Sequence, residues 1–156
     1  MNFFRYIMSL SLVAWVGGIV FFISMTPILF AVLPSRHMAG SVVSPALTRL
    51  HWIGIISGVL FLISSWAYSS ITVGYVRMGS AANVVVVLML VLTCASQFGL
   101  SPRLAKIRAE NEVMDSAPAD VRARFDALHQ WSTRIEGSVL LMGLVAVYLI
   151  SRERVY

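Results

Sequence analysis

Long stretches without a charged residue most constrain what this chain can fold into. Residues 6–35, 50–76 and 78–102 contain no Asp, Glu, Lys or Arg, and residues 137–151 form a shorter fourth stretch. A helix needs about 20 apolar residues to cross roughly 30 Å of hydrocarbon. Backbone polar groups must be paired in lipid, and these unbroken apolar runs lack the alternation that barrel strands require. The sequence therefore predicts four transmembrane helices.

The ends of the predicted spans follow from prolines and charges. Pro45 is expected to open the second span, and Ser101 and Pro102 are expected to start a new helix after the third. The fourth charge-free stretch is too short alone, so this span is expected to begin near Trp131 and to include Glu136. The prediction is an all-α, integral membrane four-helix bundle with a polar helical hairpin between spans three and four. It forms a single domain, 1–156, with spans at 6–33, 46–73, 81–99 and 131–151 and the hairpin at 102–130.

The composition supports lipid as the main solvent. Apolar residues make up 58% of the 156-residue chain and charged residues 12%, too few to cover the surface of a small soluble domain. The single cysteine, Cys94, cannot form an internal disulfide. The net charge of +5 is attributed to basic loops beside lipid headgroups. The expected partner is the lipid bilayer, with a homo-oligomer as an open alternative and no nucleic acid.

The basic residues predict an orientation. Four spans place both termini on one side of the membrane, where four basic residues fall, against eight on the other side. The positive-inside rule then favours a cytoplasmic hairpin and outward termini, in an inner or plasma membrane.

Polar residues near the starts of spans two and four are the candidate functional residues. His51 and His129 are expected at similar depth, because both spans start from the same side. Ser132 and Glu136 follow His129 along one helical face. Polar groups at membrane depth are costly, so they mark sites by default. The predicted polar cluster, at one end of the bundle, contains His51, His129, Ser132, Glu136, Arg49 and Arg134.

Three interpretations of this cluster are open. Two imidazoles on facing helices can ligate haem or a transition metal, with His51 and His129 as the ligands. A carboxylate beside a histidine can pass protons or bind a cation. The third interpretation is an interfacial network in which Arg49 or Arg134 neutralises Glu136.

Small residues at four-residue spacing indicate close helix packing. The two patterns are Ala14-x-x-x-Gly18 and Gly54-x-x-x-Gly58, which let helix backbones approach each other. Packing within the bundle is the favoured use, with homodimerisation as the alternative.

Several short motifs resemble a known family. They are Trp15-Val16-Gly17-Gly18, Phe21-Phe22, Pro27-x-x-Phe30, Ala39-Gly40, Pro102, and Arg124-Phe125-x-x-Leu128-His129-x-x-Ser132. Together they resemble the transmembrane protein 205-like family, which implies a four-span membrane protein without an established activity. In that family a neutral polar residue often stands where this chain has Glu136, so the resemblance assigns Glu136 no family-wide role.

The first motif is also similar to the copper-resistance D-type membrane proteins and to a haem-pathway oxidase family. The oxidases carry a histidine in span one, and this chain has none there.

The expected function is that of a small polytopic membrane protein assisting solute or cation tolerance or transport, without a cofactor. No nucleophile–base pair or phosphate-binding loop is present, so enzymatic activity is not expected. The alternative is a haem- or copper-handling redox protein using His51 and His129.

Overall fold

Four helical rods make up the described part of the protein. The computed structural model describes residues 2–76, 79–110 and 116–152. Each rod is long and apolar enough to cross a membrane, which confirms the prediction of an all-α, four-span architecture. The elements are α1 (Asn2–Val32), α2 (Arg36–Val73), α3 (Ala81–Cys94), the π-helical segment η1 (Ala95–Leu100), α4 (Ser101–Glu110) and α5 (Ala119–Arg152).

Local sequence signals explain several helix ends. The Ser35 hydroxyl accepts a hydrogen bond from the Met38 amide at 3.2 Å, and the Ser80 hydroxyl accepts one from the Asn83 amide at 3.3 Å. Each serine therefore satisfies an amide that the first turn leaves without an intrahelical acceptor. Helix α2 ends at Gly74, whose φ of 80° is the left-handed conformation that glycine adopts without strain.

The prediction that Pro45 opens span two is wrong. Helix α2 begins nine residues earlier, at Arg36, and Pro45 lies inside it. Ser35 already caps the helix, and a proline removes only one backbone donor from a rod of this length. A break in the helix would leave more backbone groups unpaired.

Helix α4 begins at Ser101 with Pro102 in its first turn, as predicted, but it continues the preceding rod instead of following a break. The rod passes from α3 through η1 into α4 without interruption, and the Ser101 amide bonds to the Ser96 carbonyl across a widened turn. Pro102 has no amide hydrogen, and its ring would clash with a carbonyl four residues earlier in a regular α-helix. The π-helical turn lies just before Pro102 and absorbs this conflict.

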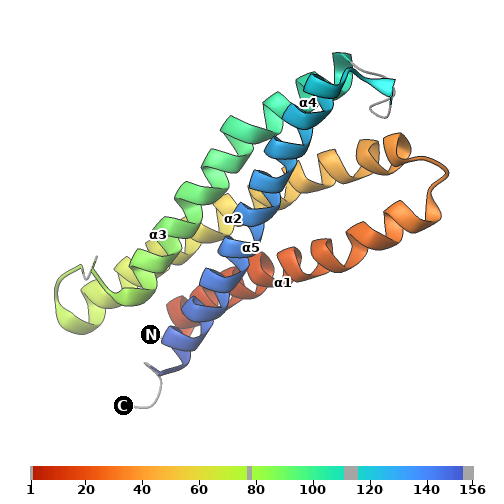
Figure 1. The fold of residues 1–156 in the computed structure, drawn as a ribbon. Helices are drawn as coiled ribbons and strands as arrows, with labels where there is room; N and C mark the ends of the chain where they lie inside the picture. Colours follow the sequence, from red (N-terminus) through yellow and green to blue (C-terminus); the bar gives the residue numbers. More distant parts are fainter. Residues whose placement is uncertain (1, 77–78, 111–115, 153–156) are drawn as a thin grey trace.

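The rods form two antiparallel pairs that cross. Helix α1 packs mainly on α2, and α5 packs mainly on the α3–η1–α4 rod. Both termini lie at the same end of the bundle, and the pairs diverge at the other end, where α1 turns into α2 and where α4 lies (Figure 1). At that end Arg108 Nη1 donates a hydrogen bond to the Gly40 carbonyl at 3.1 Å and links the pairs.

A tryptophan fills the centre of the bundle. Trp15 is 1% exposed and packs against Gly54 and Gly58 of α2, where an added Cβ would overlap its ring. On α1, Gly18 faces the Leu50 side chain, whereas Ala14 is exposed. Large apolar side chains such as Phe21 and Leu141 cover the outside. Lipid is the solvent in which such a surface is stable, whereas in water it would aggregate.

We predict that Gly54→Ala destabilises the protein. The new methyl group would overlap Trp15, and overpacking of a filled core costs about 1–3 kcal/mol. The free energy of unfolding in mixed micelles measures this cost. The control is Gly17→Ala, because an added Cβ at Gly17 meets nothing within 4 Å. Equal stability of the two variants would contradict the packing role.

Candidate functional site

A buried carboxyl–imidazole pair joins two helices inside the bundle. Nε2 of His51 on α2 lies 2.6 Å from Oε1 of Glu136 on α5. His51 is 1% exposed and Glu136 is 8% exposed, so the contact is removed from solvent and lipid. A carboxylate in such a place is stable only with a partner, and the imidazole supplies it.

A third side chain completes the site from the other side of the imidazole ring. Nδ1 of His51 lies 2.8 Å from Oε1 of Gln97, which belongs to η1. Both ring nitrogens of His51 are therefore engaged by protein groups. The site consists of Glu136, His51 and Gln97, contributed by three different rods, and we call it the Glu–His–Gln relay.

The relay lies deep in the bundle rather than at its end. Each of its residues lies close to the middle of its rod, namely Arg36–Val73, Ala81–Glu110 and Ala119–Arg152. The rods reach this length because the helices extend well beyond the charge-free stretches on the hairpin side. In the sequence these same residues lie near the ends of those stretches, which is why the cluster was predicted at one end.

An aromatic pair also joins two of the rods that carry the relay. Trp52 and Phe98, the neighbours of His51 and Gln97 in the chain, meet edge to face with their ring centroids 6.1 Å apart. Both rings are exposed on the surface that lipid covers. The crossing of α2 with η1 thus has a polar contact inside and an aromatic contact outside.

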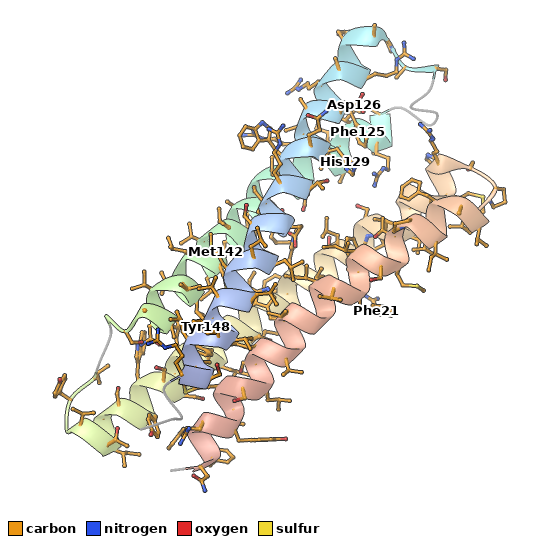
Figure 2. The ribbon with its side chains drawn as sticks, turned by 60° about the horizontal axis from the view of Figure 1, so that its bottom comes forward. Phe21, Phe125, Asp126, His129, Met142 and Tyr148 are labelled. Carbon is orange, nitrogen blue, oxygen red and sulfur yellow. The ribbon has the colours of Figure 1, made fainter. Side chains whose placement is uncertain are left out.

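The structure separates the other predicted site residues from the relay. Ser132 is buried one turn before Glu136 on α5. His129 is exposed and stacks on Phe125, with ring centroids 6.3 Å apart, where the helix pairs diverge (Figure 2). His51 and His129 therefore do not meet as a ligand pair.

The two arginines offered as partners of Glu136 also lie elsewhere. Arg49 is exposed, and the exposed Arg134 guanidinium lies over the Trp131 ring at 5.5 Å. Among the residues that the structure describes, the ion-pair partner of Glu136 is His51. A long arginine side chain reaches headgroups more cheaply than it enters the interior.

Gln97 is the site residue that the sequence analysis missed. It stands next to Ser96, whose fully buried hydroxyl has no hydrogen-bond partner in the described part of the chain. Because Gly143 lies against Met89 and the two rods run antiparallel, Glu136 comes to the level of Ser96. A glutamine close before a proline in an apolar span was the available signal, because it combines a partly buried amide with a distorted turn.

Buried polar groups continue from the relay toward the end that carries the termini. On α2, Ser57, Ser64, Ser65 and Ser69 are all buried. Asn83 on α3 is buried at the same end of the bundle. These groups add polar side chains to the core between the relay and that end of the bundle.

The relay suits proton chemistry better than metal ligation. A metal ion binds an imidazole through a free ring lone pair, and both His51 nitrogens already have partners. Within residues 2–76, 79–110 and 116–152, no three His, Cys, Asp or Glu side chains gather to hold a metal ion. A carboxyl group 2.6 Å from an imidazole nitrogen can instead share and exchange a proton.

Comparison with known proteins identifies the family. Residues 10–113, two thirds of the chain, match the family described as Domain of unknown function (DUF4149). The chain belongs to this family. The matched region contains His51 and Gln97 and ends before Glu136. No curated protein and no solved structure matches the chain.

We predict that His51 and Glu136 are energetically coupled. His51→Ala or Glu136→Ala alone leaves a buried polar group unpaired, which costs about 3–5 kcal/mol for an ion pair. The double variant removes both groups, so its loss of unfolding free energy should fall about 1–3 kcal/mol short of the sum of the single losses. A double-mutant cycle in mixed micelles measures this difference. Additive losses would contradict the coupling.

Proposed function

We propose that the protein moves protons across its membrane, with the Glu136–His51 pair as the group that binds and releases the proton. Such transport, alone or coupled to a solute, would support solute or cation tolerance. The observation that carries this proposal is the 2.6 Å contact between His51 Nε2 and Glu136 Oε1 in the buried interior of the bundle. Ionisable groups are costly at this depth and are usually retained for transport or proton relay.

The surroundings of the pair favour a proton over a metal cation. Among the described residues the pair offers one carboxylate, whereas hard cations take several oxygen ligands. A carboxyl–imidazole pair is sufficient to bind and release one proton, and it lacks the further oxygen ligands that a metal cation needs.

The buried serines of α2 favour transport over a purely structural role. A structural hydrogen bond needs only its two partners. Here Ser57, Ser64, Ser65 and Ser69 extend the polar interior along α2 beyond the pair. Hydroxyl groups both donate and accept, so they can carry a proton with bound water as an intermediate. The proposal requires no cofactor.

We expect proton flux to depend on the pair. The assay uses the purified protein in vesicles that contain a pH-sensitive dye, with a potassium gradient and valinomycin as the driving force. Glu136→Gln and His51→Gln should reduce the flux to that of protein-free vesicles, because each removes one member of the pair. The matched controls are Glu110→Gln and His37→Gln, which change the same residue types at exposed positions.

Two outcomes would overturn this proposal. The first is a wild-type flux no faster than that of protein-free vesicles. The second is unchanged flux in both relay variants, with folding verified by circular dichroism and gel filtration.

We infer a cytoplasmic hairpin and outward termini in an inner or plasma membrane. The support is the excess of basic residues on the hairpin side, since the positive-inside rule places such residues in the cytoplasm. A phosphatase that is active only outside the cytoplasm should therefore be active when fused after Tyr156. The same enzyme inserted between residues 112 and 113 should be inactive. The reverse pattern of activity would contradict this orientation.

A further inference from the structure

The amide of Gln97 and the carboxyl of Glu136 bind opposite edges of one imidazole ring. The Gln97 oxygen lies 2.8 Å from Nδ1, and the Glu136 oxygen lies 2.6 Å from Nε2. A neutral imidazole has one donor and one acceptor nitrogen, whereas an imidazolium has two donors. The protonation state of Nδ1 therefore determines whether Gln97 must present its oxygen or its NH₂ group to the ring.

With its oxygen toward the ring, Gln97 fits the protonated relay. Nδ1–H then donates to the Gln97 oxygen. The second proton lies between Nε2 and the Glu136 oxygen, either on the carboxyl, which donates to Nε2, or on the imidazolium, which donates to the carboxylate. The pair has no net charge in either arrangement, so this proton can shift without adding charge to the interior.

When the pair loses one proton, Gln97 must offer a hydrogen-bond donor to Nδ1 in place of an acceptor. The remaining proton then lies on Nε2, because a bare Nε2 lone pair facing a carboxylate would be repelled. Nδ1 becomes an acceptor, and the Gln97 oxygen in front of it has nothing to accept. A half turn of the amide presents its NH₂ group in the place of the oxygen, so the hydrogen bond is kept with a donor in place of an acceptor.

We propose that Gln97 is a positioning residue whose amide turns over each time the Glu136–His51 pair gains or loses a proton. In this way Gln97 holds the ring toward Glu136 in both states. The functional role of this amide rotation rests on the proposed proton transport. The rotation itself depends only on the hydrogen bonds of the three side chains. The widened turn of η1 carries Gln97 to this position.

Glu136 is the titratable group that contacts His51. From η1 the ring meets the neutral Gln97, and from α1 the nearby Trp15 and Gly18 carry no titratable group. Arg49 on α2 is exposed, as are His129 and Arg134 on α5, which contact Phe125 and Trp131 instead. Among the described residues, the side chains that form hydrogen bonds with His51 are therefore those of Glu136 and Gln97.

The test reads the two nitrogens of His51 directly. The chain has three histidines, so the double variant His37→Gln/His129→Gln leaves His51 as the single source of imidazole nitrogen-15 signals. In this background both nitrogens should show hydrogen-bonded shifts across the pH titration. Gln97→Met keeps the length of the side chain but removes its polar atoms. It should move the Nδ1 signal of the deprotonated state to that of an unbonded nitrogen and leave Nε2 bonded to Glu136.

Two further variants complete the test. Gln130→Met makes the same change at an exposed site on α5 and should leave both signals in place. Gln97→Glu keeps an oxygen toward the ring. In this variant Nδ1 should therefore keep its proton at pH values at which Nδ1 of the other variants has lost it. Gln97→Met should also lower the proton flux by about two- to tenfold, the factor that corresponds to one hydrogen bond.

The outcomes separate this inference from the proposed function. An unchanged Nδ1 signal in folded Gln97→Met overturns the inference and leaves proton transport standing if the wild-type flux depends on Glu136. A shifted Nδ1 signal supports the inference, whatever the flux. The absence of flux in vesicles with wild-type protein overturns only the transport proposal.

Discussion

The hydrogen bond between His51 and Glu136 is the contact on which the polar interior of this bundle depends. Glu136 is 8% exposed, and without the imidazole it would be an uncompensated charge or an unpaired acid among apolar side chains. The bond joins α2 to α5, which belong to different antiparallel pairs. It therefore fixes how the pairs cross, while Trp15 fills the space beside it against Gly54 and Gly58.

Charges and hydropathy predicted the four rods well, because lipid permits few alternatives to a helix over a long apolar run. The misplaced helix start is at Pro45, whereas at Pro102 helix α4 begins where predicted but without a break in the rod. At Pro45 and Pro102 the sequence indicated a helix start, because in water a proline more often begins a helix than lies inside one. In this bundle the cost of unpaired backbone in lipid outweighs the cost of one missing donor, so both rods continue.

The candidate site could be predicted only in part. The shared side of spans two and four placed His51 and Glu136 in one cluster, but it matched His51 in depth with His129 and put the cluster at the end of the bundle. Choosing His51 over Arg49 as the partner of Glu136 required the rotation of each helix about its axis, which packing decides. The role of Gln97 could not be predicted from the sequence, for a stronger reason. Its direction depends on the widened turn at Ala95–Leu100, and apolar periodicity does not reveal such a turn.

The family match divides the relay in a way that bears on its chemistry. His51 and Gln97 lie in the matched region, and Glu136 lies beyond it. A neutral polar group in the place of Glu136 could still bond to Nε2, so the imidazole and amide form a complete structural contact without an acid. What Glu136 adds is a second titratable site beside the ring, which lets the pair hold its proton with no net charge in the interior. In the proposed proton transport, the imidazole–amide contact positions the ring and the carboxyl group supplies the site that binds and releases the proton.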